Sequence, residues 1–191
     1  MTLLVLGLVA FLGVHMLPIL TSVRTRLRTR LGENGYKGLF TVLSIAGFVL
    51  LIYGYGVARS QGPAILYDPP LWMRHVTLLL MVPVFVLLVA SNAPAGRIKA
   101  ATKHPMILSV KIWALAHLLA NGDAASVLLF AAFLGWAVLD RISLKRRGNA
   151  GGAVSASPSM AGDVVSVVVG LGLYVAFVLY LHEWLIGVSV V

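Results

Sequence analysis

The five histidines of this 191-residue chain are the residues best suited to chemistry. Each lies in or at the end of an apolar run, and they are His15, His75, His104, His117 and His182. An ionisable side chain inside a membrane helix is costly, and it marks a functional site unless it is simply hydrogen-bonded in the interior. Either reading explains one histidine alone, whereas five together favour a pair that binds a metal ion or a haem.

The other potential ligands narrow the kind of site. The chain has no cysteine and only six acidic residues, which fall in loops or near the ends of apolar runs. Thiolate metal sites are therefore excluded, and an oxygen-lined cage for a hard cation is not expected. Ligation by imidazole alone suits haem b, copper or zinc. No nucleotide-binding loop, nucleophile elbow or HExxH motif occurs, so the sequence identifies no catalytic residue.

The elements that carry the histidines are predicted to be membrane helices. Hydrophobic residues make up 60% of the chain and charged residues 11%, against about a quarter charged in soluble domains. The apolar runs are about 17–25 residues long, the length that crosses a hydrocarbon layer of about 30 Å. The sequence therefore predicts an all-α, polytopic membrane helix bundle in a lipid bilayer.

Six transmembrane helices are predicted, and together they form a single domain over residues 1–191. They cover roughly residues 2–23, 36–58, 71–91, 103–123, 124–142 and 163–188. The first is interpreted as a retained span, because no basic segment precedes it. Pro105 suits the first helical position of the fourth run. Asp123 and Asp163 are predicted N-caps of the fifth and sixth runs. Residues 148–161 are predicted to be a flexible cytoplasmic loop.

The positive residues behind the net charge of +9 are interpreted as signals that orient the membrane helices, not as a nucleic-acid-binding surface. Twelve of the fifteen lysines and arginines lie in the segments 24–37, 97–103 and 141–147. Positively charged loops stay in the cytoplasm. These segments are therefore predicted to be cytoplasmic, and both termini to lie on the non-cytoplasmic side.

Several motifs together resemble the NnrU family of bacterial membrane proteins. They are FLGVH at 11–15, YGYGVAR at 53–59, PPLWMRH at 69–75, RIKAATKHPMILSVKIWALAHLLANGD at 97–123, LLFAAFLGWAVLDRISLKRR at 128–147 and HEWLIGVS at 182–189. The family is associated with nitrite and nitric oxide reduction in denitrification. The resemblance implies a multi-pass protein of the bacterial inner membrane whose partners are nitric oxide or nitrite reductase components.

The chain is also similar, more distantly, to 15-cis-zeta-carotene isomerase, a membrane enzyme with haem b held by two histidines. That similarity implies His15 and His117 as the axial ligands of the haem iron, although Met16 and Leu17 follow His15 where the isomerase has serine and glycine. The predicted topology instead groups His75 and His182 with His117 near the outside, and His104 with His15 nearer the inside. His75 is the alternative partner of His117, with His104 and His182 in reserve.

Three functions follow as hypotheses. The first is an NnrU-type protein that binds haem b between transmembrane histidines and supports nitrogen-oxide respiration. The second is a haem-dependent cis-trans isomerase of a carotenoid-like lipid. The third is a cofactor-free membrane assembly factor for a nitric oxide or nitrite reductase. The first two could be enzymes, as a redox protein or an isomerase, and the third is not.

Overall fold

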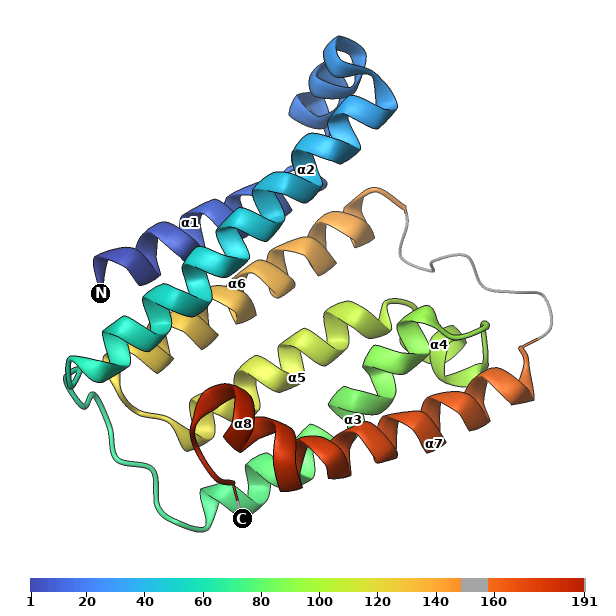
Figure 1. Cartoon of the computed structure of the whole chain (residues 1–191). Helices are drawn as coiled ribbons and strands as arrows, with labels where there is room; N and C mark the ends of the chain where they lie inside the picture. The colour runs from blue at the N-terminus through green and yellow to red at the C-terminus, as the bar shows by residue number, and fades with distance from the viewer. Residues whose placement is uncertain (149–157, 191) are drawn as a thin grey trace. The chain divides into compact units, whose positions relative to one another are not determined.

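The computed structural model describes residues 1–148 and 158–190, and these residues form helices joined by turns (Figure 1). Within this part of the chain, the extended structure is one isolated bridge between Ile65 and Asp123. The predicted all-α fold is confirmed. The elements are α1 (Thr2–Met16), α2 (Thr21–Ser60), α3 (Met73–Asn92), α4 (Arg97–Thr102), α5 (Pro105–Ala120), α6 (Ala124–Arg146), α7 (Met160–Ala176), the π-helix η1 (Phe177–Leu181) and α8 (His182–Ile186).

Within residues 1–148 and 158–190, four helical stretches are long and apolar enough to cross a membrane. They are α2, α3, α6 and the stretch Met160–Ile186. The apolar helices α1 and α5 have 15 and 16 residues, and at 1.5 Å per residue they measure only about 22–24 Å. The prediction of a multi-pass membrane protein is thus confirmed, and two of the six expected spans are shorter than the hydrocarbon core of a bilayer. The location of both termini on the non-cytoplasmic side of the membrane stays a prediction.

The boundaries of the first two spans differ from those predicted. The first helix ends at Met16 rather than near residue 23, because Pro18 lacks an N–H and the chain turns over residues 17–19. The basic run 24–30, expected in a loop, is helical and forms the start of α2. Gly32 then breaks the helix with φ 70° and ψ 171°, a backbone conformation that favours glycine.

The chain divides into two compact units, the first made of Met1–Asp68 and Asn121–Ser143, the second of Pro69–Ala120 and Leu144–Val191. The single domain over 1–191 stays a prediction. Most of the predicted flexible loop 148–161 lies outside the described residues. At its end, Ser159 precedes α7 and accepts a hydrogen bond from the backbone N of Gly162 at 3.3 Å.

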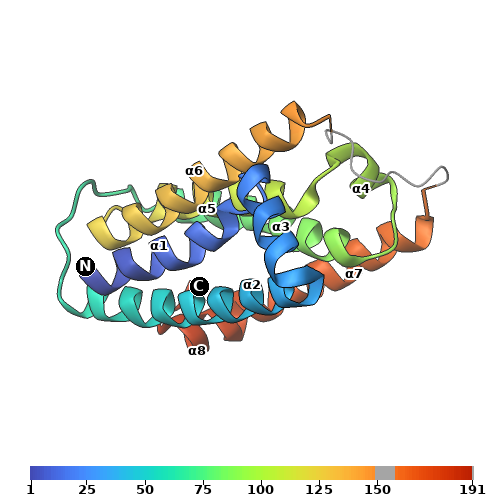
Figure 2. The ribbon, with the colours of Figure 1, turned by 90° about the horizontal axis from the view of Figure 1, so that it is seen from above.

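In the first unit, α1 packs against α2 and α6. Glycines let α1 and α2 approach closely, because a Cβ on Gly7 would lie 2.5 Å from Leu51 and one on Gly47 would lie 2.7 Å from Phe11. These two contacts run in opposite order along the helices, so α1 and α2 are antiparallel. Helix α6 runs parallel to α1, since Phe133 lies beside Phe11 and the next contact, Trp136 with His15, is further along both helices. Figures 1 and 2 show α1 beside α2. These helix directions are those expected if successive predicted spans cross the membrane in alternating directions.

The turn before α6 is fixed by polar contacts within the same unit. The Oδ1 atom of Asp123 accepts hydrogen bonds from the backbone N of Ala125 and of Ser126, at 3.1 and 3.0 Å, so the predicted N-cap is confirmed. A Cβ on Gly122 would lie 1.7 Å from the carbonyl oxygen of Tyr67, which explains why a glycine occupies this position.

Burial of the Tyr67 ring, and then the Asp123 carboxylate nearby, raise the pKa of Tyr67 above its usual 10.

In the second unit, α3 packs antiparallel to both α5 and α7. The Thr77 hydroxyl near the start of α3 donates to the carbonyl of Ala116 near the end of α5, at 2.8 Å. The Tyr174 hydroxyl on α7 donates to the carbonyl of Leu78 at 3.1 Å. At the other end of the pair, a Cβ on Gly162 would lie 2.2 Å from the carbonyl oxygen of Pro94. Close packing of α3 with α7 thus depends on small residues, as in other membrane bundles.

The predicted N-cap role of Asp163 for the last span is wrong. Ser159 caps that helix, while the Asp163 carboxylate accepts hydrogen bonds from the backbone N of Arg97 and of Ile98, at 2.9 and 3.0 Å. The first N–H groups of any helix lack partners within it, and Gly96 at the start of α4 has no side chain to supply one. Asp163 therefore caps α4 from the neighbouring helix α7.

The replacement Asp163→Ala is expected to loosen α4. Loss of an N-cap costs about 0.5–2 kcal/mol, so trypsin should cleave the segment 97–103 several-fold faster in reconstituted protein. Asp68→Ala is the control, because Asp68 is an exposed loop residue. Equal cleavage rates in wild type and Asp163→Ala would show that the carboxylate does not hold α4.

Candidate functional site

His15 lies in the last turn of α1, inside a cluster of aromatic rings from the first unit. Its ring centroid lies 4.2 Å from that of Phe11, 5.3 Å from that of Phe40 and 5.9 Å from that of Trp136. The Trp136 indole donates to the backbone carbonyl of His15 at 3.2 Å. Three helices, α1, α2 and α6, therefore position this one imidazole.

The hydrogen bond of His15 determines which ring nitrogen is available. Its Nδ1 lies 2.7 Å from the carbonyl oxygen of Phe11, one turn earlier. A carbonyl only accepts, so Nδ1 carries the proton and Nε2 carries the lone pair in the neutral ring. Within the described residues, Nε2 of His15 makes no hydrogen bond. A lone pair on one nitrogen and a backbone bond on the other is the usual state of a histidine that ligates a metal.

His117 repeats this local arrangement in α5 of the second unit. Its Nδ1 lies 2.9 Å from the carbonyl oxygen of Trp113, and the two ring centroids are 5.4 Å apart. The side chain is half-buried. His15 and His117 thus share one pattern, an aromatic residue four positions before a histidine whose Nδ1 donates to that residue's carbonyl.

His182 reaches a similar state by another route. It follows the π-helix η1, and its Nδ1 lies 2.7 Å from the carbonyl oxygen of Val188. That bond depends on the chain reversal at Gly187, which has φ 74° and ends α8. The Phe177 ring lies 6.2 Å from the imidazole, centroid to centroid. His182 therefore also presents Nε2 as the lone-pair nitrogen.

The two remaining histidines lie at helix starts in the second unit. His75 is exposed in the first turn of α3, and its backbone N bonds to the carbonyl of Trp72. His104 immediately precedes α5 and accepts at its carbonyl from the backbone N of Leu108 at 3.1 Å. Within residues 1–148 and 158–190, no three side chains of histidine, aspartate or glutamate are grouped to hold a metal ion. A haem held by two histidines does not need such a group.

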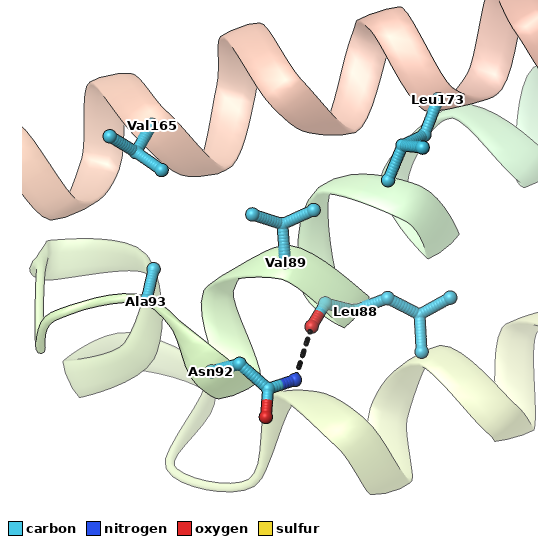
Figure 3. A pocket seen from close by; sticks show the side chains of 6 residues that line it. All are labelled: Leu88, Val89, Asn92, Ala93, Val165 and Leu173. Carbon is cyan, nitrogen blue, oxygen red and sulfur yellow. Dashed lines mark hydrogen bonds between the residues drawn. The ribbon is translucent and has the colours of Figure 1, made fainter.

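An open groove of about 450 Å³ lies between α3 and α7 in the second unit (Figure 3). Its one polar side chain, Asn92, donates to the carbonyl of Leu88 and to the hydroxyl of Ser91. None of the five candidate histidines lines the groove. It is lined by Leu88, Val89, Asn92, Ala93, Val165 and Leu173.

The sequence matches the family described as NnrU protein over residues 3–190, nearly its whole length. The chain belongs to the NnrU family. No curated protein and no solved structure gives a match. The more distant likeness to 15-cis-zeta-carotene isomerase stays a prediction.

The surroundings of His15 in this NnrU-family chain were not identified from sequence. Phe40 and Trp136 are 25 positions after and 121 positions after His15 in the chain, and only the packing of three helices brings them to the imidazole. A partial signal exists, because Phe40, Ser44 and Phe48 recur at a spacing of four and so share one face of α2. Pairing that face with His15 requires the register of α1 on α2, which the glycines set.

Proposed function

We propose that this NnrU-family protein binds haem b through Nε2 of His15 and Nε2 of His117 and serves nitrogen-oxide respiration in the bacterial inner membrane. One observation carries the proposal: both histidines donate Nδ1–H to the carbonyl of an aromatic residue one turn earlier, at 2.7 and 2.9 Å. This bond fixes the tautomer and orients the ring, as metal-binding histidines require.

The residues around His15 fit a haem ligand. The donor set is imidazole without thiolate or carboxylate, which suits haem iron. The rings of Phe11, Phe40 and Trp136 make the surroundings apolar, as a porphyrin face requires. Within the described residues, Nε2 of His15 has no hydrogen-bond partner that a metal would have to displace.

The side chains have separate tasks in this proposal. Haem b, when bound, would supply reversible one-electron chemistry and an iron atom able to bind nitric oxide once one imidazole leaves. The carbonyls of Phe11 and Trp113 keep Nδ1 of each histidine protonated, so the lone pair of each neutral ring lies on Nε2. The aromatic rings exclude water, and they thereby strengthen electrostatic interactions at the site.

Family membership supports a link to nitrogen-oxide respiration. On this basis the partners are nitric oxide or nitrite reductase components in the same membrane. The test is to express the protein with ample haem, purify it and measure haem b by the pyridine haemochrome assay. We expect about one haem per chain or per small oligomer, and a shift of the Soret band when nitric oxide is added to the reduced protein. Protein that takes up no haem would favour a cofactor-free assembly role instead.

A further inference from the structure

Ser44 carries a buried hydroxyl that has no hydrogen-bond partner within residues 1–148 and 158–190. Other serines in the helices satisfy their hydroxyl locally. Ser60, Ser91 and Ser109 donate to the carbonyl three residues earlier, and Ser166 donates to the carbonyl of Gly162. An unpaired hydroxyl in an apolar interior destabilises the protein that holds it. Among the described residues, the Ser44 hydroxyl is therefore left without an acceptor.

The position of Ser44 on α2 places this hydroxyl at the level of His15. Gly47, three residues later, lies against Phe11, and α2 runs antiparallel to α1, so Ser44 is level with the turn of α1 that holds His15. Phe40 and Phe48 flank Ser44 at four residues on either side. The Phe40 ring contacts the His15 imidazole, and the Phe48 ring contacts Phe11.

The direction in which the Ser44 side chain points follows from the contacts of other residues on α2. Tyr55 on α2 hydrogen-bonds Ser126 of α6 at 2.9 Å, so its side chain marks the side of α2 that faces α6. Gly47 marks the side that faces α1. At 100° per residue, Ser44 points between these two directions, into the interior of the first unit. The lone pair of His15 Nε2 and the Ser44 hydroxyl are thus two unused polar groups in one aromatic cluster.

We propose that the Ser44 hydroxyl donates a hydrogen bond to a carboxylate of the haem that His15 ligates, an inference that rests on the proposed function. The hydrogen-bonding groups at the edge of haem b are its two propionate carboxylates. A carboxylate in an apolar interior is costly unless hydrogen-bond donors compensate it. Ser44 and the haem carboxylate therefore satisfy each other, one supplying the missing acceptor and the other the missing donor.

The test compares haem b with its dimethyl ester, in which both carboxylates are blocked. Soret titrations in detergent give the Kd of each porphyrin for wild type, Ser44→Ala and the control Ser60→Ala. Ser60 lies on the same helix, and its hydroxyl bonds to the carbonyl of Val57. We expect Ser44→Ala to weaken haem b binding by roughly tenfold or more, to leave binding of the ester unchanged, and Ser60→Ala to change neither Kd.

A second measurement separates a ligand contact from a structural role. Thermal unfolding of the haem-free protein, followed by tryptophan fluorescence, should show Ser44→Ala at least as stable as wild type, because the hydroxyl lacks a partner there. A haem b Kd unchanged by Ser44→Ala, or an equal loss for haem b and its ester, would overturn the role of Ser44. Wild-type protein that binds neither porphyrin would instead overturn the proposed function, and the Ser44 contact with it.

Discussion

Replacing His15 and His117 together by alanine is expected to lower bound haem b at least about tenfold. The double variant removes both Nε2 ligands, whereas loss of a supporting contact alone already costs about 10–100-fold in metal affinity. Pyridine haemochrome assays on purified protein measure the change. His75→Ala is the control, since His75 is exposed at the start of α3 and should keep wild-type haem content.

The single variants distinguish ligands from structural histidines. His15→Ala and His117→Ala should each lose low-spin haem character, and added imidazole should restore it by occupying the vacated position. Rescue by a free ligand does not occur when a substitution merely misfolds the helix. Full haem content in the double variant would exclude both histidines and direct attention to His75, His104 and His182.

The replacement Gly47→Ala is expected to destabilise the first unit by about 1–3 kcal/mol, the usual cost of overpacking. A Cβ at this position would lie 2.7 Å from the backbone N of Phe11 and 2.9 Å from its Cα. Backbone atoms cannot move aside as a flexible side chain can, so α1 must shift. Because the carbonyl of Phe11 holds Nδ1 of His15, the same shift should weaken haem binding.

Gly56→Ala is the matched control for Gly47→Ala. Gly56 is an exposed glycine of the same helix, and a Cβ there would meet no atom within 4 Å. Alanine favours helix over glycine by about 1 kcal/mol, so this variant should be neutral or slightly stabilised. Thermal unfolding followed by tryptophan fluorescence compares the two. Equal stability of both variants would contradict the close packing of α1 on α2.

Local signals in the sequence predicted much of the fold. The lengths of the apolar runs predicted membrane helices, which the structure confirms. Pro105 is the first residue of α5, and Asp123 caps α6. In these cases the residue acts on the end of its own helix, so the neighbouring sequence is enough to predict where the helix begins. The resemblance to the isomerase implies His15 and His117 as ligands, and their Nδ1 bonds involve only residues one turn away.

Features that depend on packing between distant segments could not be predicted. Asp163 stands where a helix N-cap is expected, yet its carboxylate bonds to the backbone of Arg97 and Ile98. Ser44 looks like an ordinary small residue of a span until the register of α1 on α2 brings it level with His15.

The measurement that tests the central claim most directly is a reduced-minus-oxidised absorption spectrum of the purified, haem-loaded protein. Haem b with two imidazole ligands predicts a sharp α band and a Soret shift on reduction, both absent from the variant that lacks His15 and His117. A spectrum without Soret and α bands in wild-type protein would contradict the account, and so would identical bands in the double variant.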